Sequence, residues 1–331
     1  NTGSGKSNTL AKLYTELFNM RNSKLPGIKN SQFVVLDFNG EYVGKGSFRV
    51  GMLEKDIIKL STSKQTPSDN NKLKISKKDF LNTETLSILF SATEKTQKPF
   101  IENALRFYFK SNERQAMKQE QMFSKISSSF KNVLRIRNPH VYTLFLEILK
   151  ILHENSLNKE ELDFNHWLNE KFGDVEFVFL EWHQKENKYI FGVDKDKLDN
   201  CFGLEGMYHQ DGKAYIDSTV EDHVETMKNF LESHLNHKLS NTIGDLDVFD
   251  EIRMALYIRL IYEMYGGTSH YEYISPLLSR IESRTPMLRK VLKVVDDDSK
   301  GQDHKFLQII SLKDCNMEMK KVIPLLLAKS I

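Results

Sequence analysis

The sequence predicts an α/β protein in which a parallel β-sheet is interrupted by a large, mainly helical insertion. Three observations lead to this fold class. Residues 1–8 are glycine-rich and run into an amphipathic helix, residues 33–36 form an unbroken apolar run, and residues 305–312 form a further strand with a helix after it. An apolar run without alternation is typical of a strand buried on both faces, as in a parallel sheet.

The first segment, Asn1–Asn8, matches the second half of a phosphate-binding loop, G-x-x-x-x-G-K-[ST], whose first glycine would precede Asn1. Glycines allow backbone N–H groups to approach phosphate oxygens, because no Cβ atom stands in the way. Lys6 would carry a mobile positive charge to the β- and γ-phosphates, and the Ser7 hydroxyl would hold Mg²⁺. The predicted nucleotide-binding residues are Thr2, Gly3, Ser4, Gly5, Lys6, Ser7 and Asn8.

A helix should follow this loop, so that its positive end also faces the phosphates. Leu10, Leu13, Leu17 and Phe18 recur with helical spacing, and no glycine or proline interrupts them before Pro26. The alternative is a flexible Gly-Ser-rich terminus that happens to contain a lysine. An adjoining amphipathic helix disfavours it.

The next strand, Phe33–Asp37, ends in a carboxylate at the edge where open α/β sheets bind ligands. It continues as Phe38-Asn39-Gly40-Glu41-Tyr42. Two interpretations of Asp37 stand at this point. It lies beside a bound nucleotide, or it caps a turn at the strand end that needs Gly40 for its geometry.

The two motifs together resemble those of the HerA/FtsK group of P-loop ATPases, specifically the HerA-like DNA translocases. Their phosphate loop has the sequence T-G-S-G-K-S-N and their next strand ends in D-x-x-G-E-Y, which Thr2–Asn8 and Asp37–Tyr42 match. A weaker match to S-x-x-x-K-x-Q begins at Ser91. The resemblance implies a RecA-like P-loop NTPase core that uses ATP and Mg²⁺. It also implies that Asp37 and Glu41 act with Lys6 in catalysis, with Asp37 reaching Mg²⁺ directly or through water.

The resemblance further implies an ATP-hydrolysing motor. The intact protein would be a homo-hexameric ring that moves along duplex DNA. It would act with a nuclease or another effector protein, in DNA end processing or in bacterial anti-phage (antiviral) defence. The alternative is a scaffold that binds nucleotide to organise an effector and translocates little.

Three segments are predicted along the chain: residues 1–50 as the first part of the ATPase core, 51–300 as the helical insertion, and 301–331 as the return to the core. The lysine-rich residues 44–82 are either a DNA-facing patch or a solvated connection, and interleaved aspartates and glutamates favour the connection. Predicted strands in the insertion are 175–180 and 214–216. Predicted helices are 83–90, 94–108, 111–130, 141–153, 221–235, 248–264, 271–283 and 286–291.

A hydrolase of this kind needs a second acidic strand end, whose carboxylate polarises the attacking water. The internal candidate, Val291–Asp297, is interrupted by Lys293, so we expect this strand beyond Ile331 and expect the fragment itself to be inactive. His234 and His237 have a spacing that could bind metal, but without a third ligand surface histidines are favoured.

The composition narrows the class of protein. The net charge of +2 provides no global field for nucleic acid, so DNA contacts would come from local patches. Cys201 and Cys315 form no C-x-x-C pattern, which predicts a reduced, cytoplasmic chain without zinc. No apolar run reaches transmembrane length and no signal peptide is present, so no membrane partner is expected.

Overall fold

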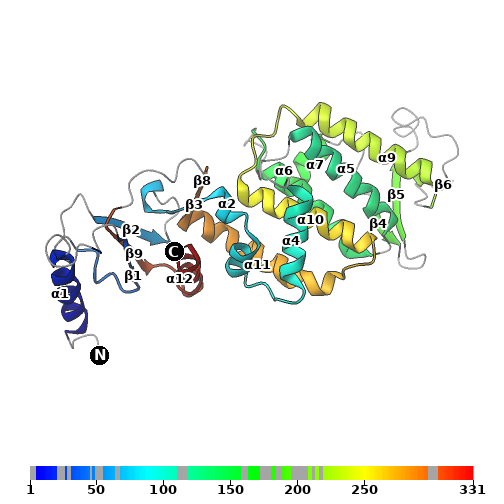
Figure 1. Cartoon of the computed structure of the whole chain (residues 1–331). Helices are drawn as coiled ribbons and strands as arrows, with labels where there is room; N and C mark the ends of the chain where they lie inside the picture. Colours follow the sequence, from blue (N-terminus) through cyan, green and yellow to red (C-terminus); the bar gives the residue numbers. More distant parts are fainter. Residues whose placement is uncertain are drawn as a thin grey trace. The chain divides into compact units, whose positions relative to one another are not determined.

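The computed structural model divides the chain into two compact units, whose elements are labelled in Figure 1. Unit 1 comprises Asn1–Ala92 and Ser279–Ile331, and unit 2 comprises Thr93–Leu278. The described residues are 5–20, 27, 31–44, 47–48, 55–63, 68–109, 118–136, 138–157, 163–171, 180–183, 188–194, 208–210, 213–215, 219–296 and 305–330.

A parallel β-sheet forms the centre of unit 1, which confirms the α/β class. Within the described residues it has three strands, β1 (Phe33–Asp37), β9 (Leu307–Asp314) and β2 (Lys55–Ser61), in the order β1-β9-β2. The central strand is buried on both faces. In register, Asp37 of β1 and Lys59 of β2 both lie opposite Ser311 of β9.

Helix α1 (Lys6–Asn19) covers one face of this sheet. Its Phe18 is only 2% exposed, and the Phe18 ring lies 4.9 Å from the ring of Phe33 and 5.2 Å from that of Phe306. Because side chains alternate along a strand, every second residue faces the helix. The sheet residues packed in this cluster follow that rule: Phe33, Val35, Ile57, Leu307 and Ile309.

Unit 1 holds further elements that the sequence did not predict. Strand β3 (Leu73–Ser76) pairs in parallel with β8 (Leu292–Val295). A 3₁₀ turn, η4 (Asp69–Asn71), precedes β3, and short helix α2 (Lys77–Phe80) follows it. Residues 55–92 and 279–296 thus belong to unit 1, whereas we placed the segment boundaries near residues 50 and 300.

The prediction of a solvated connection over 44–82 was wrong for the strands β2 and β3. Both strands are short and lie in a lysine-rich stretch, so their few apolar residues did not mark them as strands. One of these lysines, Lys55, is itself buried, and its ammonium donates to the carbonyl oxygens of Gly44 (3.3 Å) and Ser47 (2.7 Å). A lysine whose charge is satisfied by carbonyls can occupy a buried strand position.

Helices complete unit 1. Helix α3 (Thr83–Phe90) has the predicted bounds, and α12 (Met317–Ser330) packs against it. The guanidinium of Arg284 donates to the Leu89 carbonyl at 2.7 Å and to Glu318 at 2.6 Å. Arg284 therefore links three elements of unit 1.

Helix α11 (Tyr271–Val291) crosses from unit 2 into unit 1 as one helix. We predicted two helices, with a break between Ser283 and Pro286, and this was wrong. A proline inside a helix removes one hydrogen bond at a cost of about 3 kcal/mol. The fully buried Leu288 and Val291 beyond it bury enough apolar surface to offset that cost.

Unit 2 is mainly helical. Its helices are α4 (Gln97–Tyr108), α5 (Gln119–Arg135), α6 (Pro139–Glu154), α7 (Phe164–Lys171), α9 (Glu221–His234), the π-helix η6 (Leu235–Leu239) and α10 (Val248–Tyr265). Helix α10 is buried almost all round and packs against α4, α5 and α6 (Figure 1). Most of these helices match the prediction within three residues. Helix α5 lies later than the predicted 111–130, and α4 begins later because residues 94–96 form a turn.

A small antiparallel sheet also belongs to unit 2. Its strands are β4 (Leu180–His183), β5 (Lys188–Asp194), β6 (Tyr208–Gln210) and β7 (Lys213–Tyr215), in the order β4-β5-β7-β6. Strand β7 overlaps the predicted strand 214–216. The predicted strand 175–180 lies almost wholly outside the described residues. A membrane-spanning helix is not found in the described part of the chain, since none of its helices combines the necessary length and apolarity.

Candidate nucleotide-binding site

The N-terminus of α1 is open to an anion. Gly5 caps the helix in the left-handed conformation (φ +70°), and a Cβ atom built on it would meet nothing within 4 Å. Within the described residues no side chain caps the first turn, and the first turn itself contains no acidic residue. The N–H groups of the first turn and the positive end of the helix dipole together suit an anion. Lys6 is exposed beside them, whereas Thr2, Gly3 and Ser4 lie outside the described residues.

The two predicted motifs meet at Ser7. Its hydroxyl donates a hydrogen bond to Oε2 of Glu41, across 34 residues of chain. Glu41 comes from the turn after β1, and Ser7 from the first turn of α1. The structure thus brings together the predicted metal-binding hydroxyl and one of the two predicted acidic residues.

Asp37 orders the turn that carries Glu41. Its carboxylate is 2% exposed and accepts three backbone N–H bonds, from Gly40 (2.8 Å), Glu41 (3.0 Å) and Tyr42 (2.8 Å). This is the turn-capping arrangement, the second of the two interpretations left open by the sequence. A contact between Asp37 and Mg²⁺ stays a prediction.

Gly40 has a backbone conformation that favours glycine, and the side chain of Lys313 lies against it. The φ of Gly40, +78°, lies in the left-handed region, which disfavours residues with a Cβ atom. A Cβ atom there would also lie 2.7 Å from Cδ of Lys313 on β9. The turn is therefore closely packed against the end of the central strand.

The chain beyond the turn is held in place by Lys55. Its bonds to the carbonyls of Gly44 and Ser47 fix the segment that follows Glu41, and burial lowers the pKa of Lys55 below its ordinary value. The ring of Tyr42 packs on Phe48, with centroids 5.1 Å apart. Lys55 carried no signal in the sequence, because a single lysine in a lysine-rich stretch has no distinctive pattern.

The side chains present fit an Mg²⁺-nucleotide. Ser7 offers a hydroxyl oxygen that Glu41 holds in place by a hydrogen bond, and Mg²⁺ in nucleotide sites uses one or two such protein oxygens together with phosphates and waters. No cluster of three or more His, Cys, Asp or Glu side chains suited to a metal occurs among the described residues. A protein-only metal cage is thus not what this part of the chain provides.

The other candidates from the sequence lie elsewhere. Strand β8, which precedes Asp296, pairs with β3 and not with β1 or β9, and Lys293 bonds to Asp69 at 2.6 Å. His234 is buried, with its ring 5.4 Å from that of Phe230. Neither feature approaches Ser7 and Glu41 through any contact in the described residues.

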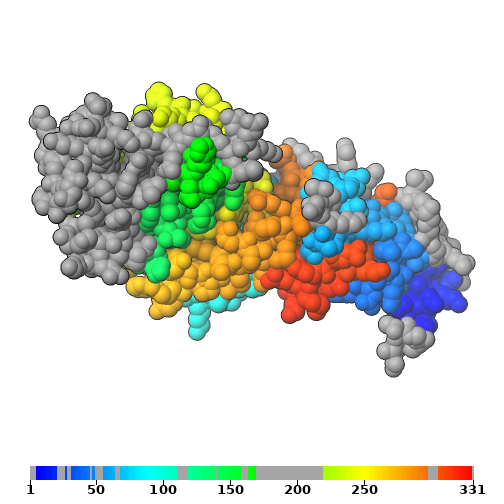
Figure 2. Space-filling view, turned by 180° about the vertical axis from the view of Figure 1, so that it is seen from behind, coloured from blue at the N-terminus to red at the C-terminus, as the bar shows by residue number. Residues whose placement is uncertain are grey.

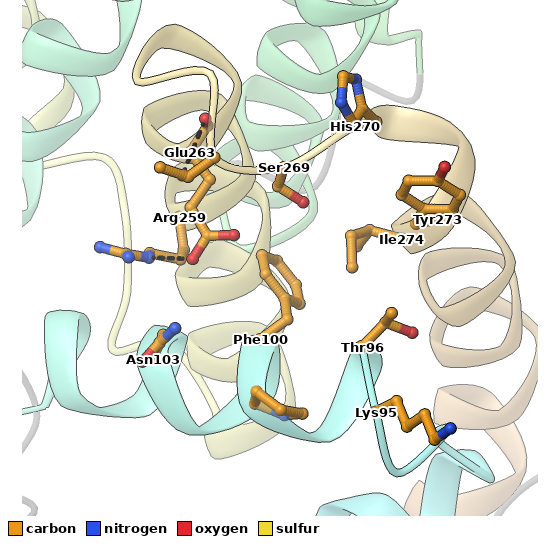
Figure 3. Close-up of a pocket in the computed structure, with 12 residues that line it drawn as sticks. Lys95, Thr96, Phe100, Asn103, Arg259, Glu263, Ser269, His270, Tyr273 and Ile274 are labelled. Carbon is orange, nitrogen blue, oxygen red and sulfur yellow. Dashed lines mark hydrogen bonds and ion pairs between the residues drawn. The ribbon is translucent and has the colours of Figure 1, made fainter.

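Unit 2 contains a cavity of about 480 Å³ between α4, the end of α10 and the start of α11 (Figure 3). Figure 3 shows Phe100 at its centre, with the Arg259–Glu263 ion pair (2.7 Å) on one side and Tyr273 on the other. None of the predicted site residues lines this cavity.

Comparison with known proteins gives one family. The model of the family described as "Helicase HerA, central domain" matches residues 1–187, which is more than half of the chain. The match covers both predicted motifs and continues into unit 2. A comparison with curated proteins gave no match. The chain therefore belongs to the HerA central-domain family.

Proposed function

We propose that this chain is the nucleotide-binding part of an ATPase motor of the HerA/FtsK type, with a RecA-like core that uses ATP and Mg²⁺. The observation that carries this proposal is the hydrogen bond from Ser7 to Glu41 at the open N-terminus of α1. It joins a phosphate-loop hydroxyl to the glutamate of the second motif. Family membership supports the same function.

Each side chain has a distinct role in this proposal. Lys6 neutralises the β- and γ-phosphates, and Ser7 turns its oxygen lone pairs to Mg²⁺ while its O–H donates to Glu41. Glu41 thereby orients a metal ligand from behind, as outer-shell carboxylates commonly do. Bound Mg²⁺ supplies charge neutralisation at the transferred phosphate.

Glu41 and Asp37 differ in what they can do for hydrolysis. Glu41 is exposed, so its second oxygen is able to hold a water near the phosphates. Asp37 is buried, and its carboxylate oxygens accept hydrogen bonds from three backbone N–H groups, so it positions Glu41. To bind Mg²⁺ as well, the same two oxygens would have to form additional bonds. We propose positioning as its main contribution to turnover.

The assembly belongs to the same proposal. The intact protein is a homo-hexamer in the cytoplasm that moves along duplex DNA and acts with a nuclease or another effector, in DNA end processing or anti-phage defence. The support is family membership alone. A nucleotide-dependent scaffold with little translocation is the competing outcome of the tests below.

The test is nucleotide binding by Lys6→Ala in the full-length protein, measured with a fluorescent ATP analogue. We expect the Kd to rise at least about tenfold, since a cation that contacts phosphate is worth more than about 1.4 kcal/mol. The circular dichroism spectrum should stay unchanged because Lys6 is exposed. The matched control is Lys12→Ala, which removes the same charge from an exposed position of the same helix. An unchanged Kd for Lys6→Ala would refute the assigned site.

A further inference from the structure

Lys313 lies near the end of β9, the central strand of the unit 1 sheet. Its side chain is exposed, although the strand before it is buried. In the described part of the chain, its ammonium makes no hydrogen bond or ion pair. No feature of the sequence singled it out.

The register places Lys313 just beyond Ser311, the residue of β9 that lies opposite Asp37. Phe33 lies opposite Leu307, and Asp37 lies opposite Ser311. Phe33 packs on α1 through Phe18, and Leu307 and Ile309 belong to the same cluster. Beyond Ser311 the pairing with β2 is irregular, because Lys59 lies opposite Ser311 but Ser61 lies opposite Asp314. Lys313 therefore lies at the carboxyl edge of the sheet, where β1 ends at Asp37.

The turn that carries Glu41 lies against Lys313. The position of a Cβ atom on Gly40 would be 2.7 Å from Cδ and 3.4 Å from Cβ of Lys313, so the aliphatic stem covers this glycine. Gly40 is the residue before Glu41, and Glu41 reaches Ser7. One chain of contacts thus joins Lys313, the acidic turn and the phosphate-loop hydroxyl.

We propose that Lys313 is a second phosphate-binding cation of the nucleotide site, acting with Lys6 on the terminal phosphate of ATP. This rests on the function proposed above. A triphosphate brings about four negative charges into a site where Asp37 and Glu41 are already acidic, so one lysine and Mg²⁺ leave charge to be neutralised. A lysine suits this place because its flexible stem can cross the turn and carry a compact charge beyond it.

This proposal gives a functional reason for the presence of a glycine at position 40. Its missing Cβ atom lets the stem of Lys313 cross the turn at van der Waals distance. Lys59, exposed on β2 and also opposite Ser311, lies one strand farther from β1. We assign the role to Lys313 because it is the lysine whose stem contacts the acidic turn.

The experiment compares ATP and ADP affinity for three variants of the full-length protein, with fluorescent analogues at low salt. Lys313→Met keeps a similar stem on Gly40 but removes the charge, and Lys313→Arg keeps the charge. Lys305→Met is the matched control, because it makes the same chemical change just before the opposite end of the same strand. We expect Lys313→Met to weaken ATP binding about tenfold and ADP binding less than about threefold. Lys313→Arg should stay within about threefold of wild type and Lys305→Met within about twofold.

Three results would overturn the proposal: ATP affinity of Lys313→Met within about twofold of wild type, equal losses for ATP and ADP, or an equal loss in Lys305→Met. These failures differ from failure of the proposed function. If wild type binds ATP and Lys6→Ala does not, the site exists whatever Lys313 does. If wild type and Lys6→Ala behave alike, the nucleotide site itself is wrong.

Discussion

Single residues of the nucleotide site differ in how far the sequence could place them. Ser7 and Glu41 belong to motifs whose residue types are dictated by phosphate and metal chemistry, so both were identified before their contact was seen. The contact itself was not predictable, because it depends on where the turn after β1 lies relative to α1. Lys55 and Lys313 were missed, since a lone lysine has no pattern until the structure shows what its side chain contacts.

The carboxylate of Asp37 offers a test at the residue scale. Asp37→Asn should lower the free energy of unfolding of unit 1 by about 2 kcal/mol, because an amide group leaves at least one buried N–H without its acceptor. Urea titration followed by circular dichroism measures the loss. Asp314→Asn makes the same chemical change on an exposed side chain and should cost less than about 0.5 kcal/mol. Equal stability of Asp37→Asn and wild type would show that these bonds do not hold the turn.

Helices in which apolar residues recur with a regular spacing were predicted well, whereas short strands that contain lysines were not. Helices α3, α6 and α9 carry apolar residues at helical spacing over two or more turns, and their bounds came out within about two residues. The bounds of α10 came out equally close, although this helix is buried almost all round. Strands β2, β3 and β8 are short and contain lysines, so their patterns are too brief to mark them as strands. Their place becomes evident only through pairing with strands more than two hundred residues away.

Helices α5 and α9 of unit 2 are joined by a row of ion pairs. Lys131 of α5 bonds to Glu221 (3.0 Å) and to Glu225 of α9, and Lys228 bonds to Glu225 at 2.9 Å. The bonds from Lys131 and Lys228 lower the pKa of Glu225 to about 2. A carboxylate with a lowered pKa stabilises the fold above its ordinary pKa of 4.5, and this stabilisation is lost as the pH falls toward 2.

The lowered pKa of Glu225 makes the contribution of the ion pairs to stability depend on pH. Glu225→Gln should lower the urea midpoint of unit 2 at pH 6, and the difference from wild type should shrink steadily as the pH is lowered from 4.5 toward 3. Both tryptophans, Trp167 and Trp182, belong to unit 2, so their fluorescence follows this unit. Asp245→Asn changes an exposed loop carboxylate and should show no such trend. A difference that stays constant with pH would mean that the ion pairs do not link the helices.

For the whole molecule, the sequence predicted that a helical segment interrupts an α/β core. The chain leaves unit 1 after Ala92 and returns at Ser279, and the strands on either side pair in parallel. The central strand and α1 lie far apart in the sequence yet share one core, and α1 remains at the surface (Figure 2). Composition and periodicity could not locate the boundaries between the two units. These boundaries depend on which strands pair with one another, and not on how polar their residues are.

The effect of duplex DNA on the rate of ATP turnover distinguishes the motor from the scaffold. In the full-length protein, duplex DNA should raise the rate of ATP turnover, and Lys6→Ala should abolish both the basal and the stimulated rate. The stimulation should fall steeply as salt is raised, because neutralised DNA phosphates release counterions. Heparin at equal charge is the control, since a generic polyanion has no duplex along which a motor can move. If ATP assembles the ring while duplex DNA leaves turnover unchanged, or if heparin stimulates as strongly as DNA, the motor is refuted. A ring that assembles with ATP but ignores DNA is the result that the scaffold predicts.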